Sequence, residues 1–328
     1  MVKFGILGAG AIAGTFCDAV NGIQEHLHAV ASRDLEKAEA FAKTHAIPKA
    51  YGSYEELLDD PEVTCVYVAT PHAFHYEQMK MCIEKNKHIL CEKAFTLNAA
   101  QAKEIFELAD AKNLFVMEAM WTRFLPTILE VKKLIDEDVI GDIFQIDANF
   151  GFRADKKPKD RLFDPILGGG ALLDIGIYPV TLANLFLGIP DSFESNVTFH
   201  PSGVDLCEKI RYFYPEAEAV LTASFKEDLG TEATIYGTKG YVTFPGFHSA
   251  QVATVYNNNH KVVKMIEHKH LVNGMEYEVF ETVKCIKKRC TESSIMPHET
   301  TLQIMRQMDE IRHSWNFRYP QELAENNI

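Results

Sequence analysis

The stretch KFGILGAGAIA, residues 3–13, decides the fold of this chain. Its apolar part, Lys3–Leu7, predicts a strand, and the pattern G-x-G-x-x-A follows at once from Gly8 to Ala13. Gly8 permits a tight turn, Gly10 lets the backbone approach a pyrophosphate, and Ala13 lets the next helix lie close to the sheet. Ala11 and Ile12 complete the turn, whose free N–H groups favour anions. The strand, turn and helix together predict a dinucleotide-binding site.

The pattern that continues from this turn is an alternation of short apolar strands with amphipathic helices. Ser53 with Glu56, and Asn98 with Gln101, have the spacing of capping boxes and predict two helix starts. Alternation of this kind predicts a doubly wound α/β domain with a parallel sheet, and we assign it to residues 1–120. The predicted strands are Lys3–Leu7, His28–Ser32, Cys65–Thr70, His88–Glu92 and Leu114–Glu118, and the predicted helices include Leu35–Thr44, Tyr54–Asp59 and Asn98–Lys112.

The pattern changes near residue 120, so we assign residues 121–328 to a second domain. A predicted helix, Thr127–Asp136, precedes a predicted strand, Asp142–Gly151, and a succession of strands then runs from Ser192 to Lys264. Helices at 276–288 and 299–315 end the chain. This order predicts an α+β domain with a large, mostly antiparallel, open sheet.

Composition and charge exclude several classes of protein. The formal net charge of -13 opposes a general nucleic-acid or anionic-membrane surface, because the summed field repels phosphates. The seven cysteines are scattered, as expected for free thiols in a reducing compartment. The first residues do not form a signal peptide, and we find no stretch of about 20 apolar residues that could span a bilayer. We therefore expect a cytoplasmic protein.

The second predicted strand ends in Ser32-Arg33-Asp34, which bears on the choice of dinucleotide. A carboxylate at this position is typical of NAD sites, whereas an arginine accommodates the 2′-phosphate of NADP. Ser32 and Arg33 therefore favour NADP, although NAD stays possible. In the alternative interpretation Arg33 is a solvated charge and Asp34 is the N-cap of the next helix.

Two further segments follow strands and are expected at the carboxyl edge of the same sheet. Thr70-Pro71-His72 with His75 favours cofactor contact or helix capping over a metal pair, because no acidic or cysteine partner stands at metal-site spacing. The second segment is Glu92-Lys93. A partly desolvated lysine near a nicotinamide would handle protons, but a lysine at a strand end is also often a surface charge.

The segment GGGALLDIGIYP, Gly168–Pro179, carries Asp174 and Tyr178 four residues apart. On a helix these side chains share a face, and the glycines let the backbone approach a ligand. A phenol titrates near pH 10, and a lysine cation nearby would stabilise its phenolate. Lys93 beside Tyr178 would therefore allow tyrosine acid/base chemistry. The spacing alone, however, favours a half-buried core aromatic at Tyr178 and a paired structural carboxylate at Asp174.

Along nearly its whole length the chain resembles the glucose-fructose oxidoreductase/inositol dehydrogenase (Gfo/Idh/MocA) family. The segments that together carry this resemblance are GILGAGAIA, ASRDLEKA, IPKAYGSYEELL, LCEKAF, MEAMWTRFLP, GGGALLDIGIYPV and YGTKG. Within this family the chain looks like the dihydrodiol and NADP-dependent D-xylose dehydrogenases. The resemblance implies a Rossmann domain, a C-terminal domain whose open sheet often forms a dimer, and hydride transfer between NAD(P) and a hydroxyl of a sugar, polyol or diol.

The same resemblance implies roles for individual residues. The family's E-K-P lysine falls on Lys93, with Ala94 replacing the usual proline, and its D-x-G-x-[HY] motif falls on Asp174 and Tyr178. The arginine that binds the NADP phosphate falls on Arg33. The residues implied in substrate binding are Trp121, Arg123, Phe150, Arg161, Asp174 and Tyr178; no metal is expected.

The sequence therefore predicts a cytoplasmic NADP-dependent dehydrogenase of a small sugar, polyol or diol, most simply a homodimer through the C-terminal sheet. Two alternatives stay open. One is a nucleotide-sensing regulator without activity, and the other is a glycoside hydrolase that uses tightly bound NAD. Lys93, Asp174 and Tyr178 argue against the first, and Arg33 against the second. The basic loop Arg153–Arg161 looks more like the sugar-oxidising members and leaves room for an anionic keto substrate.

Overall fold

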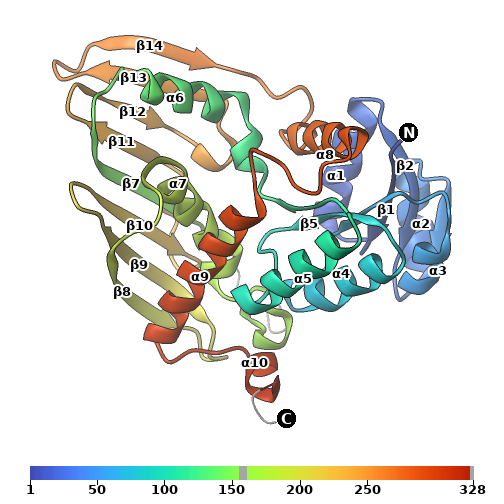
Figure 1. Ribbon diagram of the computed structural model, residues 1–328. Helices are drawn as coiled ribbons and strands as arrows, with labels where there is room; N and C mark the ends of the chain where they lie inside the picture. Colours follow the sequence, from blue (N-terminus) through green and yellow to red (C-terminus); the bar gives the residue numbers. More distant parts are fainter. Residues whose placement is uncertain (155–160, 326–328) are drawn as a thin grey trace. The chain divides into compact units, whose positions relative to one another are not determined.

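A computed structural model describes residues 1–154 and 161–325, drawn in Figure 1. The chain divides into two units. The first comprises Met1–Trp121 and His270–Met305, and the second comprises Thr122–Lys269 and Arg306–Ile328. The first unit is therefore discontinuous in sequence, whereas the sequence analysis assigns everything after residue 120 to one domain.

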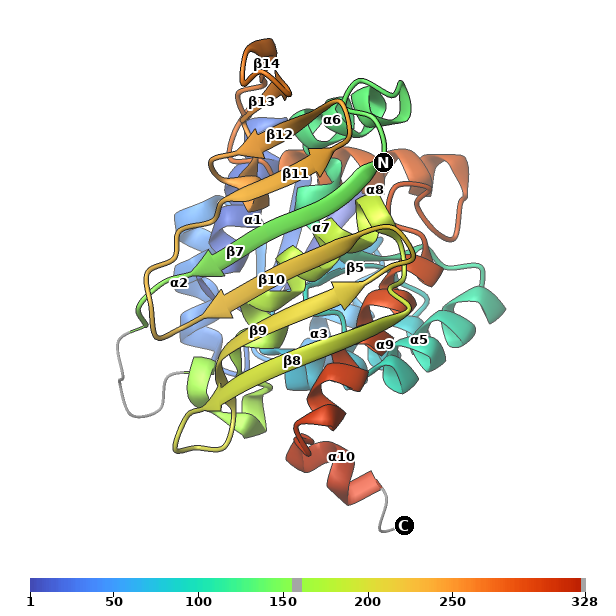
Figure 2. The same cartoon turned by 90° about the vertical axis from the view of Figure 1, so that its left-hand side faces the viewer.

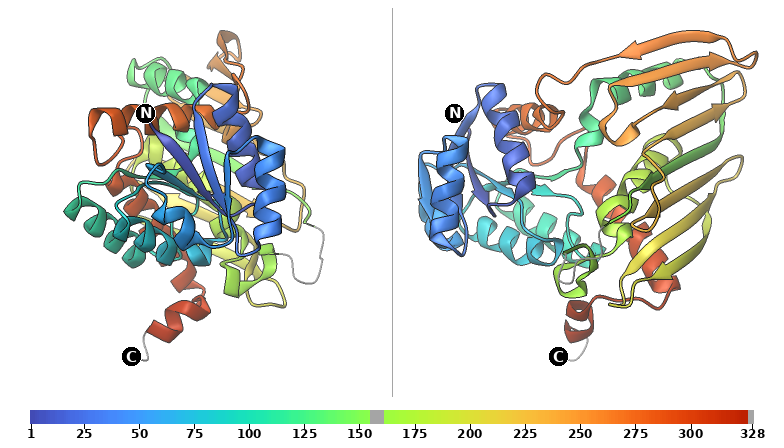
Figure 3. Two further views of the ribbon diagram at one scale, coloured as in Figure 1. Left: turned by 90° about the vertical axis from the view of Figure 1, so that its right-hand side faces the viewer. Right: turned by 180° about the vertical axis from the view of Figure 1, so that it is seen from behind.

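The first unit contains a parallel sheet with strand order β3-β2-β1-β4-β5-β6, which is the predicted doubly wound topology. Helices α4 and α5 lie on one face, and α1 and α2 on the other (Figure 3). The strands are β1 (Lys3–Leu7), β2 (His26–Ala31), β3 (Lys49–Tyr51), β4 (Cys65–Val68), β5 (His88–Glu92) and β6 (Val116–Ala119). The helices are α1 (Ala11–Gly22), α2 (Leu35–His45), α3 (Tyr54–Asp59), α4 (His75–Glu84), α5 (Ala99–Ala111) and α8 (Glu276–Lys288).

Both predicted capping residues begin helices. The Ser53 side chain accepts a hydrogen bond from the Glu56 N–H at the start of α3, and the Asn98 side chain accepts one from Gln101 at the start of α5. The short strand β3 is absent from the sequence prediction. It has only three residues and lies at the sheet edge, so its pattern is too short to indicate a strand.

The second unit contains an eight-stranded, mostly antiparallel sheet with order β14-β13-β12-β11-β7-β10-β9-β8, in which β7 and β10 are parallel. Helices α6 (Pro126–Asp136) and α7 (Ile177–Leu187) lie behind it in Figure 2, and no helix of the described part of the chain covers its near face. The strands are β7 (Ile143–Gly151), β8 (Ser192–Phe199), β9 (Asp205–Phe213), β10 (Glu218–Ser224), β11 (Ala233–Gly237), β12 (Gly240–Phe244), β13 (Val252–Asn257) and β14 (Val262–Glu267).

Two helices end the chain. Helix α9 (His298–Ser314) starts in the first unit and ends in the second, and α10 (Pro320–Glu325) follows in the second unit. The buried guanidinium of Arg312 joins them, because its Nη1 donates to Glu322 Oε2 at 2.8 Å. This ion pair fixes the end of the chain to the second unit.

One segment of the second unit corrects the sequence analysis. Residues Pro165–Leu187 are long and apolar enough to cross a membrane, contrary to the statement that no such stretch exists. In the structure 89% of the apolar window is buried inside the protein, as in the core helix of a globular unit. Its apolar character is therefore explained by burial against the protein itself.

Glu208, on β9, is a buried carboxyl group whose two oxygens have no hydrogen-bond partner among the described residues. Burial, followed by repulsion from Asp205 and Cys207, raises the pKa of Glu208 well above its usual range. The folded protein therefore keeps this proton at a pH where the unfolded chain, with a carboxyl pKa of about 4.3, has released it. Its contribution to stability falls as pH rises above that value.

We therefore expect Glu208→Gln, which cannot ionise, to leave the thermal midpoint unchanged near pH 4 and to raise it at pH 8. The rise should be about 2 to 4 °C for each kcal/mol of ionisation penalty removed. Thermal unfolding across this pH range tests the expectation, with Glu216→Gln, which alters an exposed carboxylate, as control. An equal change at both pH values would show that the pKa of Glu208 is the same in the folded and unfolded protein.

Candidate active site

The turn between β1 and α1 has the backbone that the glycine pattern predicts. Gly8 has φ +101°, and a Cβ there would lie 2.9 Å from the Ala69 carbonyl oxygen, so only glycine fits. A Cβ at Gly10 would meet no atom within 4 Å, which leaves open space beside the backbone. No side chain caps the start of α1, and Ala13 is completely buried. The exposed N–H groups and the space beside Gly10 fit a dinucleotide pyrophosphate.

The segment after β2 places Arg33 at the surface of the first unit. The Asp34 side chain accepts a hydrogen bond from the Lys37 N–H and caps α2, as the alternative interpretation of this segment expects. Buried Ser32 accepts one from the Asp34 N–H through Oγ. The Arg33 guanidinium lies 5.6 Å from the centroid of the Phe74 ring, a cation–π contact that sequence reasoning missed.

The loop after β4 is joined to the loop after β5 by His75. This side chain is completely buried, with Nε2 2.8 Å from the Thr70 carbonyl oxygen and Nδ1 3.0 Å from that of Ala94. Burial lowers the pKa of His75. The structure thus gives His75 a place between the two loops, and its contact with a cofactor stays a prediction.

The rest of that loop is held locally. The Thr70 hydroxyl donates to Gln78 Oε1 at 2.7 Å, and Pro71 precedes a short 3₁₀ helix, His72–Phe74. The buried ring of His72 packs edge-on to that of His75, with centroids 5.8 Å apart. These contacts present one fixed loop at the carboxyl edge of the sheet.

Lys93 directly follows β5, at the same edge of the sheet. Its neighbour Glu92 is buried and accepts a hydrogen bond from the Tyr67 hydroxyl, so Glu92 is structural. The Tyr67 ring stacks on Phe16 of α1 with centroids 3.7 Å apart. Ala94 is buried and stands where the family usually has a proline, and its carbonyl oxygen lies within hydrogen-bonding distance of His75 Nδ1. The lysine therefore follows a strand end that is fixed on both sides.

Trp121 is supported by the loop that returns from the second unit. Gly274 has φ +102°, and a Cβ there would lie 2.6 Å from Cζ3 of Trp121, so the indole packs against bare backbone. The His270 ring lies edge-on to it, with centroids 6.3 Å apart. The Glu276 carboxylate accepts hydrogen bonds from four consecutive N–H groups, those of residues 271–274, and fixes this loop.

In the second unit, Asp174 and Tyr178 lie on one continuous helical segment. It begins as a π-helical turn, Leu172–Gly176, and continues as α7, with Pro179 in the first turn of α7. Sequence reasoning expected a helix here, kinked at Pro179, but not a π turn; π turns are often found at functional sites. Both residues are buried, with 6% of Asp174 and 7% of Tyr178 exposed. The segment therefore brings a carboxylate and a phenol into the same buried region.

The ring of Tyr178 contacts two other rings, those of Phe150 and His248. Phe150 of β7 lies 5.4 Å from the Tyr178 ring, and His248 lies 5.8 Å from Tyr178 and 4.8 Å from Phe150, measured between centroids. The Thr122 hydroxyl donates to the His248 carbonyl oxygen at 2.6 Å and holds that segment. Sequence reasoning predicted Phe150 but missed His248, because no pattern beyond the preceding Pro245-Gly246 turn singles it out.

The predicted arginines differ in their surroundings. Arg161 Nη1 lies 3.2 Å from Asp174 Oδ1, with the arginine side chain 55% exposed and that of Asp174 9% exposed. Arg123 is buried and belongs to the second unit, which begins one residue earlier, at Thr122. The predicted basic loop from 155 to 160 lies outside the described residues. The ion pair gives Asp174 a defined polar partner.

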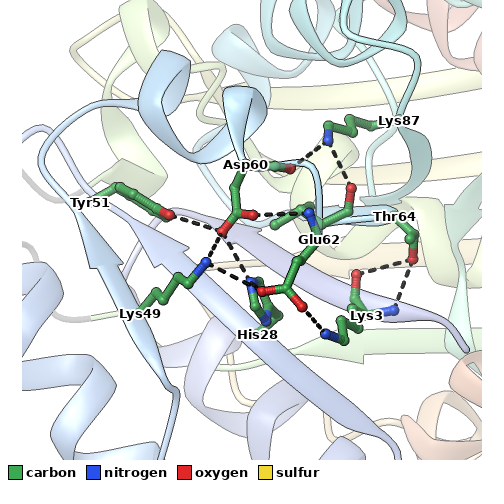
Figure 4. A network of polar contacts seen from close by, with 9 residues as sticks. Lys3, His28, Lys49, Tyr51, Asp60, Glu62, Thr64 and Lys87 are labelled. Atoms are coloured by element: carbon green, nitrogen blue, oxygen red, sulfur yellow. Dashed lines mark hydrogen bonds and ion pairs between the residues drawn. The ribbon is translucent and has the colours of Figure 1, made fainter.

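Outside these segments, His28, Asp60 and Glu62 have the spacing of a metal site (Figure 4). The position of a cation is already taken by an ammonium group, since Lys49 Nζ lies 2.8 Å from Asp60 Oδ2 and 3.6 Å from Glu62 Oε2. Burial opposes ionisation of Asp60, but hydrogen bonds from Lys49, the Glu62 N–H and Tyr51 lower its pKa. The cluster is a structural ion-pair network.

Comparisons with known proteins agree with this arrangement. Residues 2–120 match the model of an oxidoreductase family with an NAD-binding Rossmann fold, and residues 128–243 match the GFO/IDH/MocA C-terminal domain. Proteins named trans-1,2-dihydrobenzene-1,2-diol dehydrogenase from Xenopus tropicalis and Homo sapiens are 36% and 33% identical to this chain. The alignments cover 97% and 98% of this chain and 99% of each relative.

Solved structures share the fold at lower identity. A 3-ketoreductase from Actinomadura kijaniata in complex with NADP superposes with a TM-score of 0.85 at 23% identity, covering 95% of this chain and 97% of that one. A levoglucosan dehydrogenase in complex with NADH and levoglucosan has a TM-score of 0.87 at 19% identity, with 95% and 96% covered. The chain therefore belongs to the GFO/IDH/MocA family of oxidoreductases, with an NAD-binding Rossmann domain followed by that family's C-terminal domain.

Proposed function

We propose that this protein is an NADP-dependent dehydrogenase that transfers hydride between the nicotinamide and a hydroxyl of a small sugar, polyol or vicinal diol. The observation that carries the proposal is the buried carboxylate and phenol, Asp174 and Tyr178, on one segment of the second unit. The relatives named dihydrodiol dehydrogenase support a diol, and the structural neighbours named for sugars support a sugar.

The cofactor assignment starts from the open phosphate turn. The N–H groups at the start of α1 would hold the pyrophosphate, and Gly10 leaves the space for it. Arg33, held by Phe74, would pair with a 2′-phosphate, and no carboxylate stands at the tip of β2 to prefer the ribose hydroxyls of NAD. The bound nicotinamide supplies or accepts the hydride.

In the proposed mechanism, Tyr178 moves the proton of the substrate hydroxyl. A phenol with an unperturbed pKa near 10 is a weak base at neutral pH, and the Lys93 ammonium would favour its ionised form. Asp174, paired with Arg161, would orient the substrate hydroxyls. Trp121 and Phe150 would exclude water from the reacting carbon.

Polar groups of the second unit favour a hydroxyl-rich substrate. The imidazole of His248 lies beside Phe150 and Tyr178, and the paired Arg161 and Asp174 would add further hydrogen-bonding groups. Aldoses, polyols, aromatic dihydrodiols and small keto compounds, each offered with NADP(H) and NAD(H) and followed by absorbance of the reduced cofactor, test the proposal. Absence of turnover with every compound, despite measurable NADPH binding, would favour the regulator without activity.

We expect Arg33→Ala to weaken NADP binding by about tenfold to a hundredfold, because a charge-assisted hydrogen bond to phosphate is lost. NAD binding should change by less than about threefold. Titration with both reduced cofactors, followed by fluorescence, measures this difference. The control is Lys37→Ala, which removes a positive charge on the neighbouring helix α2. Equal losses for the two cofactors would place Arg33 against a part that they share.

The uncovered face of the large sheet supports a homodimer. Tyr241 stacks on Tyr256 with centroids 4.8 Å apart and lies 6.0 Å from Tyr236, so aromatic rings cross three neighbouring strands. A second copy of this chain would cover such a face. Sedimentation velocity tests this assignment, and a species of 37.0 kDa at all concentrations would refute it.

A further inference from the structure

The start of the π-helical turn is held by a buried carboxylate from another element. Asp205, at the first position of β9, is completely buried, and its Oδ2 accepts a hydrogen bond from the Leu172 N–H at 2.6 Å. Burial raises the pKa of Asp205 to about 6, while the N–H groups of Leu172 and Ala171 act in the opposite direction. The Leu172 N–H is therefore bound by a carboxyl group that is removed from solvent.

The glycine triplet makes room for this carboxylate. Gly170 has φ +120°, and a Cβ there would lie 2.3 Å from Asp205 Oδ1. Gly169 is equally restricted, because a Cβ would lie 2.7 Å from the carbonyl oxygens of Arg161 and Leu162. The glycines of this segment thus allow the backbone to approach the protein's own groups closely.

A second contact fixes the same turn from the end of the chain. The buried Tyr319 hydroxyl, between α9 and α10, donates to the Gly169 carbonyl oxygen at 2.8 Å. The turn is therefore held at a carbonyl group by Tyr319 and at an N–H group by Asp205. Leu172 stands two residues before Asp174 and six before Tyr178, so the register of both side chains depends on this anchor.

We propose that Asp205 is a positioning residue that sets the placement of Asp174 and Tyr178 through the N-terminal end of the π turn. The inference rests on the proposed function, because it takes Tyr178 as the acid/base. A displacement of about 1 Å at a reacting group can cost a factor of about 100 in rate. Loss of the anchor should therefore slow the chemical step, while NADP, which binds in the first unit, keeps its affinity.

The test compares Asp205→Ala with Asp205→Asn, which keeps one acceptor oxygen. The control is Glu281→Gln, which alters a buried carboxylate of the first unit whose partners include Lys284 and Ser293. Hydrogen exchange of peptides covering residues 168–178 reports on the anchor independently of activity. In Asp205→Ala we expect faster exchange and a kcat lower by about 10- to 100-fold. Asp205→Asn should show smaller changes in the same directions, and the control should keep wild-type values.

The outcomes separate this inference from the proposed function. Absence of turnover by the wild type with every compound of the panel would refute the proposed function, and normal turnover by a Tyr178→Phe variant would refute the acid/base role of Tyr178. In either case the exchange measurement would still report whether Asp205 anchors the turn. Slow turnover by Tyr178→Phe with wild-type kcat in both Asp205 variants would overturn the positioning role alone. If Asp205→Ala does not fold, wild-type exchange and kcat in Asp205→Asn would overturn it equally.

Discussion

A Tyr178→Phe variant is expected to turn over about 100 to 10,000 times more slowly than the wild type, with unchanged affinity for NADPH. The substitution removes only the hydroxyl, and loss of a positioned acid/base costs a factor of this size. The ring contacts with Phe150 and His248 should persist, since they involve the ring and not the oxygen. Steady-state kinetics with the best substrate of the panel, together with NADPH titration, measure both quantities.

A matched control is available for this experiment in the same unit. Tyr256→Phe removes a hydroxyl from a tyrosine that stacks on Tyr241 of the large sheet. It should leave kcat within about twofold of the wild type. If Tyr178→Phe retained normal turnover across the pH range, another group would have to carry the proton, and the proposed mechanism would fail.

Lys93→Met is expected to lower kcat about 100-fold, because in the proposed mechanism its ammonium group would favour the ionised phenol. Lys93 belongs to the first unit and Tyr178 to the second, so a double-mutant cycle is the direct test of their cooperation. If both act on the same proton, adding Lys93→Met to Tyr178→Phe should cost less than about a further threefold.

The cycle has a clear opposing result. Two losses that multiply in the double variant would mean that the residues act independently. The pH profile adds a second readout, because the apparent pKa of the basic limb should rise in Lys93→Met if the ammonium favours the phenolate. Lys80→Met, which alters a lysine in contact with Tyr76 on α4, provides the control.

Sequence patterns predicted much of the first unit because its helices and strands depend mainly on interactions between residues that are close in the sequence. The strand, turn and helix at Lys3–Ala13 and the caps at Ser53 and Asn98 depend on neighbouring residues, and each has the expected form. The order of the sheet then follows from general rules for parallel crossovers. The edge strand β3 was not predicted, because three residues are too few to show the alternation of apolar and polar side chains that indicates a strand.

The second unit depends more on contacts between distant residues. The motif at Gly168–Pro179 allowed the segment to be recognised, but not its π turn. The turn is anchored by Asp205, which accepts a hydrogen bond from the Leu172 N–H and stands 33 residues away in the sequence. His248 was missed for the same reason, because Phe150 and Tyr178 are distant from it in the sequence and contact it only in the folded protein. Sequence patterns name residues that act alone more readily than those that hold others in place.

The return of residues 270–305 to the first unit has a consequence for biosynthesis. Val116 of β6 donates its N–H to the Thr291 carbonyl oxygen, and the Thr301 hydroxyl donates to the carboxylate of Glu118. Helix α8 also contacts α1, which begins at the phosphate turn. A nascent chain that has left the ribosome only as far as residue 121 lacks these partners. The nucleotide-binding unit can therefore be completed only after residues 122–269 of the other unit have been synthesised, although its first 121 residues are encoded first.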